Sequence, residues 1–294
     1  MNRWRKDKPK RPVPTISAPI RPPRIEEEDR PRPPFSAGSL LRPVAAFAAA
    51  LRFLTILPLP GRFGAAEKDL AHAAPFFPLI GLLLGCIAAP AAKLLFILLP
   101  PLPAAALTVL LLLAFSGGLH LDGLADTADG FFSARTRERM LEIMKDSSIG
   151  SMGAIALALV LLLKTACLAS LNEPLLPAVL LMPLAGRAAI LILMALLPYP
   201  REHGLGRLFA LYFHSSAGKA AALAGLLLCA LAAHVLAGAQ GVAVMAATLL
   251  LTLFFAALCQ RKIGGATGDT LGAACELAET AVALFFTLRT ALLL

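Results

Sequence analysis

Long apolar segments separated by short polar breaks make up most of the chain after residue 40. Apolar runs of about 17 to 25 residues are long enough to cross a bilayer as helices. The pattern therefore predicts an all-α fold, a polytopic membrane helix bundle with about seven transmembrane helices. The predicted spans are 76–99, 102–116, 153–171, 175–197, 219–237, 241–259 and 276–294.

A shorter apolar segment, residues 44–59, precedes the first predicted span. It contains Arg52 and ends in the sequence LPLPG. This length and this charge favour an interfacial or re-entrant helix, and an eighth span is the alternative.

The first 34 residues differ in composition from the rest. Proline and arginine dominate them, interrupted by the acidic run EEED at 26–29. Such a segment cannot bury enough apolar surface to fold. We expect residues 1–40 to form a disordered Pro/Arg-rich cytoplasmic tail and residues 41–294 to form one membrane-embedded domain.

The net charge of +9 is unevenly distributed. The polar breaks at 100–103, 172–174 and 238–241 carry no lysine or arginine, whereas the three breaks that alternate with them, each following one of them, do. Cytoplasmic loops of membrane proteins are enriched in these residues. We therefore expect a membrane partner and no nucleic acid, with the basic loops in the cytoplasm. Their basic residues are Arg135, Arg137, Arg139, Lys145, Arg201, Arg207, Lys219, Arg261 and Lys262.

The most chemically distinctive stretch is SGGLHLDGLADTADG, residues 116–130. On a helix Asp122, Asp126 and Asp129 are spaced i, i+4 and i+7, so they share one face. Three like charges on one face repel unless a cation compensates them. Carboxylate oxygens favour Mg²⁺ or Mn²⁺, and Mg²⁺ commonly shares its ligands with a phosphate. We expect a catalytic metal–phosphate site here; three solvated aspartates at a helix end are the alternative.

Neighbouring residues extend this candidate site. His120 is a candidate general base or substrate-orienting group, and capping of the preceding apolar helix is equally compatible with its position. Glu142 and Asp146 form another i, i+4 pair beside Lys145. We expect Asp146 to add a metal ligand and Lys145 to contact the substrate, unless this segment is an ordinary solvated helix.

A second acidic segment, GGATGDTLGAACELAE, occupies residues 264–279. Its glycine-rich turn precedes a helix, and backbone N–H groups in such turns hold phosphate oxygens. Asp269 is also compatible with a simple N-cap. The candidate substrate-binding residues here are Gly264, Gly265, Thr267, Asp269, Glu276 and Glu279.

Two cations, Lys164 and Arg187, fall in the interior of predicted spans, whereas Lys93 and Arg289 lie toward the outer ends of theirs. A charge within a bilayer usually faces the bundle interior and has a partner. We expect Lys164 and Arg187 either to pair with the acids or to contact an anionic substrate.

The motifs FPLIGLLLG, GGLHLDGLADTADGFFSARTRERMLEIMKDSSIGSMG, GRAA, REHGLG and GGATGDTLGAACELAE together resemble the cobalamin synthase (adenosylcobinamide-GDP ribazoletransferase) family. The similarity extends from about residue 44 to the C-terminus. The second motif is long and highly specific.

This resemblance implies a multi-pass enzyme of the cytoplasmic (inner) membrane, with its active site facing the cytoplasm. It implies that adenosylcobinamide-GDP and α-ribazole, or its 5′-phosphate, are joined to give adenosylcobalamin, or its 5′-phosphate, and GMP. It also implies Mg²⁺ as cofactor. A homo-oligomer is compatible with the sequence.

Two other functions compete with this one. A CDP-alcohol-type membrane phosphotransferase also uses several aspartates on helices, but it would begin with DGxxAR, and here Leu-Ala-Asp follows Asp122 and Gly123. A cation-coupled transporter would place its acids near the bilayer midplane in repeated halves. Here the acids gather near one face and no internal repeat is visible.

The predicted orientation can be tested by labelling. Single cysteines introduced near Arg137, Arg207 and Lys262 in a cysteine-free background should react only with reagents that enter the cytoplasm, because positive loops stay inside. Labelling of any of the three from outside intact cells would contradict the common cytoplasmic face.

Overall fold

The computed structural model describes residues 38–171, 175–200, 209, 213, 215–292. The predicted tail and the REHGLG motif, with Arg201 and Arg207, lie outside this part of the chain. The chain divides into residues 1–39 and residues 40–294, and the account below concerns the second unit.

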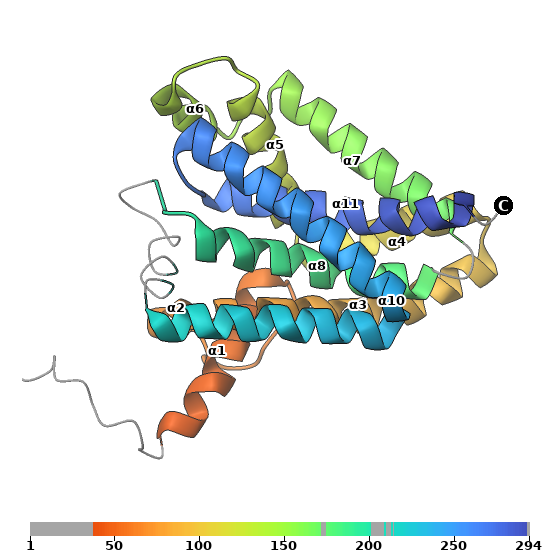
Figure 1. Cartoon of the computed structure of the whole chain (residues 1–294), viewed down its shortest axis with the longest axis horizontal. Coiled ribbons are helices and arrows are strands. Elements are labelled where there is room, and N and C mark those ends of the chain that lie inside the picture. Colours follow the sequence, from red (N-terminus) through yellow and green to blue (C-terminus); the bar gives the residue numbers. More distant parts are fainter. Residues whose placement is uncertain (1–37, 172–174, 201–208, 210–212, 214, 293–294) are drawn as a thin grey trace, which may run out of the picture. The chain divides into compact units, whose positions relative to one another are not determined.

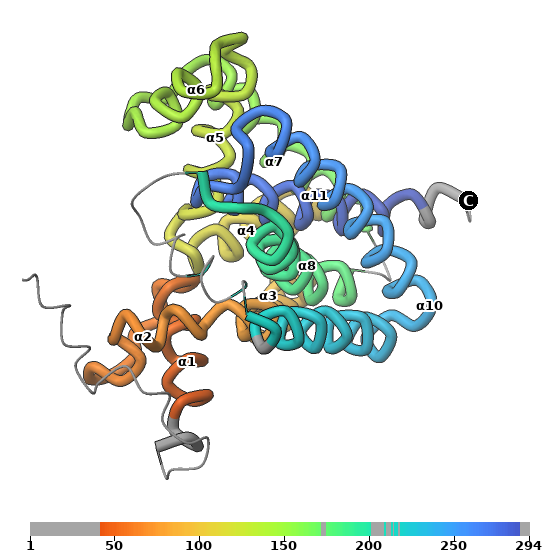
Figure 2. Tube along the Cα trace, turned by 60° about the vertical axis from the view of Figure 1, so that its left-hand side comes forward, coloured from red at the N-terminus to blue at the C-terminus, as the bar shows by residue number. Residues whose placement is uncertain are grey.

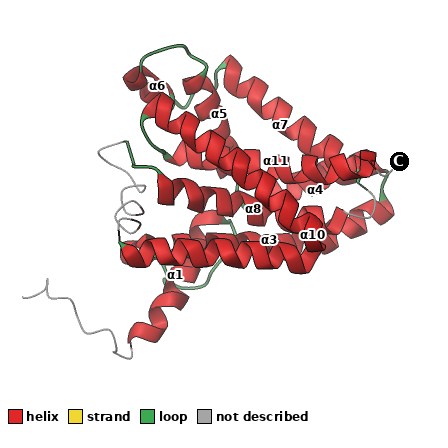
Figure 3. Ribbon diagram, viewed as in Figure 1, coloured by secondary structure: helices red, strands yellow, loops and turns green. Residues whose placement is uncertain are grey.

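Every regular element in the described part of the chain is helical, and no strand occurs there (Figure 3). The all-α prediction is confirmed. The elements are α1 (Gly38–Leu54), α2 (Glu67–Ala71), the 3₁₀ turn η2 (Ala74–Phe76), α3 (Phe77–Leu98), α4 (Pro101–Phe115), α5 (Leu119–Phe131), α6 (Arg137–Ile143), α7 (Ser151–Ser170), α8 (Leu175–Leu196), α10 (Ser216–Ile263) and α11 (Gly268–Leu292).

Several of these helices can cross a membrane, so the chain has the architecture of a multi-pass membrane protein. Five described helices are long and apolar enough, and a sixth span results if α4 and α5 are counted as one broken span. The predicted number of seven is not confirmed. The five candidate spans are Ala74–Leu98, Ser151–Ser170, Leu175–Leu196, Gly218–Ile263 and Gly268–Leu288.

One predicted boundary agrees with the structure and another differs from it. The polar break at 238–241 coincides with the non-helical backbone angles of Ala237 and Gly238, where the two helices that together carry the label α10 meet. The chain reverses there so tightly that a Cβ on Gly241 would contact the carbonyl of Ala233. In addition, α11 begins at Gly268, eight residues before the start of the predicted span at 276. Glu276 and Glu279 therefore lie inside the helix, where both are buried in the bundle.

The segment 44–59 does not form an eighth span. Helix α1 ends at Leu54, and its 17 residues are not among the candidate spans. The chain after it folds back on Arg52, whose guanidinium donates to the carbonyl oxygens of Leu59 at 2.9 Å and Gly61 at 2.7 Å. This arginine therefore fixes the loop that connects α1 to α2.

Helix α8 lies at the centre of the bundle, with α3, α10 and α11 packed around it (Figures 1 and 2). Every residue from Leu181 to Met194 is buried. A helix that is apolar on all faces is expected in such a position. Helix α7 lies further out and exposes many leucines, as a lipid-facing helix does.

Close approach of α3 to α8 depends on two glycines. A Cβ on Gly81 would contact the carbonyl of Pro183, and one on Gly85 would lie 2.9 Å from the Cα of Leu180. Small residues are what allow helix backbones to approach closely inside a membrane, where apolar burial supplies no driving force between helices.

Among the described residues, the segments that carry basic residues and the uncharged breaks lie toward opposite ends of the bundle. Figure 1 shows α6, the end of α10 and the end of α8 toward the left, and the α3–α4 turn and the α10 reversal toward the right. The acidic segments in α5 and at the start of α11 belong to the left-hand end. The chain thus collects its chemically rich segments at one end.

Substitution of Gly85 by alanine should separate α3 from α8, because the added methyl group meets backbone atoms that cannot rotate away. We expect a loss of about 1–3 kcal/mol in the free energy of unfolding, measured by reversible denaturation of the purified protein in detergent.

Gly225→Ala in α10 is the control, because its methyl group would meet a flexible leucine, the Leu191 Cδ2 atom at 3.2 Å. It should be neutral or slightly stabilising. Equal effects of the two substitutions would show that the α3–α8 contact is not tight.

Candidate active site

A sharp break between α4 and α5 creates the candidate site. The two helices are bent by 92°. Gly117 and Gly118 connect them with φ angles of +60° and +77°, a conformation that favours glycine. The backbone N–H of Ile56 donates to the carbonyl of Phe115 at 2.8 Å, so the segment after α1 is held against the break.

A cavity of about 740 Å³ opens at this break. Its walls come from the end of α1, the α4–α5 break, α5, the α6–α7 loop and α7. Thr55, Ser116 and Ser147 contribute hydroxyl groups, and Phe53 and Ile56 contribute an apolar wall. Polar and apolar groups therefore converge on a space large enough for part of a sizeable ligand.

Two of the three predicted aspartates line this cavity, Asp122 and Asp126. Asp122, in the first turn of α5, is exposed, and Asp126, one turn later, is half-buried. Gly123, between them, packs on α11, where a Cβ would lie 2.6 Å from the carbonyl oxygen of Asp269. The two acids lie on the adjacent face of α5, which borders the cavity.

Asp129 lies differently. Its carboxylate accepts backbone N–H groups from Gly150 at 2.7 Å and Gly153 at 2.8 Å, at the start of α7. It is absent from the cavity lining. The predicted triad on one face therefore divides into two cavity residues and one that caps a neighbouring helix.

The α6–α7 loop carries Lys145 and Asp146, both exposed. One carboxylate oxygen of Asp146 accepts the N–H of Ser148 at 3.0 Å, and this hydrogen bond lowers the pKa of Asp146. No three acidic, histidine or cysteine side chains in the described part of the chain are arranged to hold a metal ion. The four predicted carboxylates are not gathered into one such group, and their assignment as metal ligands stays a prediction.

The glycine-rich turn before α11 is mostly closed to a ligand. Its N–H groups at Ala266 and Thr267 already donate, to the carbonyl of Pro198 at 2.9 Å and to the hydroxyl of Thr270 at 2.9 Å. Thr267 is fully buried, and its hydroxyl donates to Asp269 at 3.2 Å. Gly265 packs against Pro198. The N–H of Gly264 donates to the carbonyl of Gln260 at 3.1 Å, at the end of α10. The expectation that this turn cradles a phosphate is not supported by these contacts.

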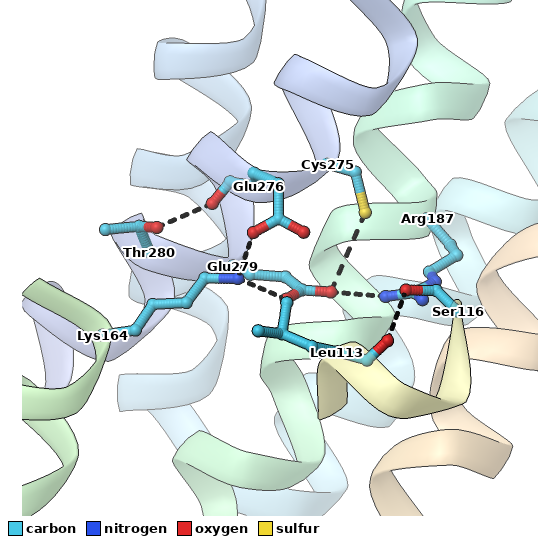
Figure 4. A network of polar contacts seen from close by, with 8 residues as sticks. All are labelled: Leu113, Ser116, Lys164, Arg187, Cys275, Glu276, Glu279 and Thr280. Atoms are coloured by element: carbon cyan, nitrogen blue, oxygen red, sulfur yellow. Dashed lines mark hydrogen bonds and ion pairs between the residues drawn. The ribbon is translucent and has the colours of Figure 1, made fainter. Parts of the chain in front are cut away.

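The buried charges form one network across three helices (Figure 4). Lys164 of α7 donates to Glu276 and to Glu279 of α11, each at 2.7 Å. Arg187 of α8 pairs with the other carboxylate oxygen of Glu279. These side chains are 1–4% exposed. The predicted cations thus pair with acids, the first of the two predicted alternatives, and none of the four lines the cavity.

His120 is buried beside this network and not in the cavity. It is 3% exposed, lies within electrostatic reach of Arg187 and Glu279, and its Nε2 has no hydrogen-bond partner among the described residues. Its backbone packs on Gly272 of α11, where a Cβ would lie 3.0 Å from the carbonyl oxygen of His120. A general-base role would require contact with the cavity that this arrangement lacks.

Sequence reasoning missed several cavity residues. Phe53 lies at the end of α1, Thr55 and Ile56 directly follow that helix, and Ser116 and Ser147 are common polar residues. Of these residues, only Ser147 has a local sequence feature that indicates a site, because it directly follows Asp146 in a polar stretch between two helices.

Residues 46–287 match the family model described as cobalamin-5-phosphate synthase. The chain belongs to this family. An adenosylcobinamide-GDP ribazoletransferase of Roseiflexus sp. is 41% identical over 246 residues, 84% of this chain and 90% of that protein. One from Citrobacter koseri is 43% identical over 242 residues, 79% of this chain and 95% of that protein. No solved structure matches the chain.

Membership of the cobalamin-5-phosphate synthase family confirms the resemblance and makes the chain an enzyme of cobalamin synthesis. The matched range includes every cavity residue, both acidic segments and the buried charge network. The competing functions, a CDP-alcohol-type phosphotransferase and a cation-coupled transporter, gain no support.

Replacement of Lys164 by methionine should destabilise the bundle, because Glu276 would lose its cation and Glu279 one of its two. Removing one partner of a buried ion pair typically lowers the free energy of unfolding by about 3–5 kcal/mol. Reversible unfolding in detergent measures this loss.

Lys93→Met is the matched control. Lys93 is an exposed lysine of the membrane helix α3, so its loss should change stability by no more than about 0.5 kcal/mol. Wild-type stability of Lys164→Met would show that the network contributes nothing to the fold.

Proposed function

We propose that the chain is an adenosylcobinamide-GDP ribazoletransferase and that the cavity at the α4–α5 break is its active site. A ribose hydroxyl oxygen of α-ribazole, or of its 5′-phosphate, attacks the phosphorus of the diphosphate that is attached to adenosylcobinamide. A new P–O bond forms, the bond between the two phosphates breaks, and GMP leaves. The hydroxyl proton passes to solvent.

The observation that carries this proposal is the pair of aspartates in the cavity of a chain whose relatives bear that name. A diphosphate brings negative charge that two carboxylates alone would repel. Two carboxylates in a site that binds a diphosphate therefore require a cation between them and the phosphates to offset this repulsion.

The residues present fit Mg²⁺. Mg²⁺ is commonly held by one or two carboxylates together with waters and substrate phosphates, so Asp122 and Asp126 suffice where a larger cluster is absent. When bound, Mg²⁺ would neutralise charge that develops on the phosphate oxygens. Asp146, exposed on the adjoining loop, does not belong to this pair, and Asp129 is engaged by α7.

The remaining cavity residues have roles that follow from their chemistry. Phe53 and Ile56 offer an apolar surface against which a flat aromatic base can pack. Thr55, Ser116 and Ser147 can hydrogen-bond to hydroxyl or phosphate oxygens. We propose that Lys145, exposed beside Ser147, attracts the anionic substrate to the cavity entrance.

The proposed site lies at the end of the bundle that carries the basic loops. If these loops are cytoplasmic, both substrates reach the cavity from the cytoplasm and the lipid-facing helices anchor the enzyme in the inner membrane. The labelling experiment above tests this orientation independently of activity.

The test is release of GMP by purified protein supplied with adenosylcobinamide-GDP, α-ribazole and Mg²⁺. Asp122→Asn and Asp126→Asn should each lower turnover by at least about 100-fold, because each removes charge that stabilises the transition state. Chelation of Mg²⁺ should abolish turnover of the wild type.

Asp69→Asn is the control, since Asp69 lies on α2 and outside the cavity lining. It should retain wild-type turnover. Full activity of both cavity variants at saturating Mg²⁺ would remove the metal assignment, and absence of GMP release by the folded wild type would remove the proposed reaction.

A further inference from the structure

Asp129 of the α5 motif makes two hydrogen bonds to another helix. Each oxygen of its carboxylate accepts one backbone N–H, from Gly150 at 2.7 Å and from Gly153 at 2.8 Å. These are donors at the N-terminus of α7, which has no side-chain cap of its own. Asp129 belongs to α5 and therefore caps a different helix, α7, which begins more than twenty residues later in the chain.

The two glycines make room for this contact. A Cβ on Gly150 would clash with the Asp129 carboxylate, and so would one on Gly153. The carboxylate thus lies directly on the backbone of the α7 N-terminus.

This position is unfavourable for a metal cation. The N-terminus of a helix carries a partial positive charge, which attracts a carboxylate and repels a cation. Both oxygens already accept hydrogen bonds from that terminus. Asp122 and Asp126, by contrast, line an open cavity.

The capped terminus adjoins the cavity. The loop that leads into α7 contributes Ser147 and Ile149 to the cavity lining, and the capped residue Gly150 follows directly. Loss of the Asp129 contact would therefore release one wall of the cavity without changing its acids.

We propose that Asp129 is a positioning residue that fixes the 147–150 wall of the cavity through the α7 N-terminus, and that it does not bind the metal. This inference rests on the proposed function, since it assigns different roles to the acids of one motif. It predicts that the three aspartates differ in what their loss changes.

The experiment compares Asp129→Asn with Asp122→Asn and Asp126→Asn in the full-length enzyme in detergent. Asparagine keeps one acceptor oxygen, so one of the two hydrogen bonds is lost. We expect the KM for adenosylcobinamide-GDP to rise about tenfold or more, as misplaced supporting groups typically cause. The Mg²⁺ concentration for half-maximal activity should stay within about twofold of wild type for Asp129→Asn and rise for the other two.

Amide hydrogen exchange supplies a readout that does not depend on turnover. Exchange of the Gly150 and Gly153 amides should accelerate in Asp129→Asn, and it should stay unchanged in Asp126→Asn. Ser151→Ala is the control, because Ser151 is an exposed residue of the same turn whose side chain is not part of the cavity lining. It should leave exchange, KM and Mg²⁺ dependence unchanged.

Two results would overturn the inference. One is a rise in the Mg²⁺ requirement of Asp129→Asn equal to that of Asp122→Asn. The other is unchanged exchange at Gly150 and Gly153. If Asp129→Asn fails to fold, Gly150→Ala takes its place, because the added methyl group displaces the same carboxylate. This variant should raise the KM and accelerate amide exchange at the start of α7 while leaving the Mg²⁺ requirement unchanged. A raised Mg²⁺ requirement or unchanged exchange would overturn the inference. An inactive wild type would refute the proposed reaction, while the exchange measurement would still decide the role of Asp129.

Discussion

Close backbone contact at a few glycines determines how this bundle is assembled. Gly81 and Gly85 bring α3 onto the central helix α8. Gly186 of α8 makes room for the side chains of α11, because a Cβ there would lie 2.7 Å from the sulfur of Cys275. Gly123 and Gly272 then bring α5 onto α11. In a bilayer, where apolar side chains gain little by leaving lipid, such contacts supply packing that larger residues would prevent.

The geometry of the proposed site follows from this packing. Helix α5 is fixed on one side by its contact with α11 and at its start by the glycine break after α4. The adjacent face, with Asp122 and Asp126, forms part of the wall of the cavity. At the end of α5, Asp129 is bound to α7. One short helix thus has three neighbours that together set the direction of its acids.

The sequence was sufficient for the helical class, for most helix positions and for the family, because apolar length and a long specific motif are local properties. It was insufficient where distant contacts decide. The i, i+4, i+7 spacing placed Asp129 with the other aspartates, but its partners are glycines more than twenty residues away. The apolar segment before residue 59 gave no sign that Phe53 and Ile56 line the cavity. The roles of the site residues remain predictions.

The buried network has a consequence for how such sequences can vary. Lys164 and Arg187 contribute two positive charges, and Glu276 and Glu279 two negative ones, so the group is neutral as a whole. An exchange at one position leaves an uncompensated charge in a low-dielectric interior. Exchanges that remove one acid and one cation together keep the balance, and apolar residues of similar volume could then fill the space. These four positions, far apart in the chain, are therefore constrained to change in concert during divergence.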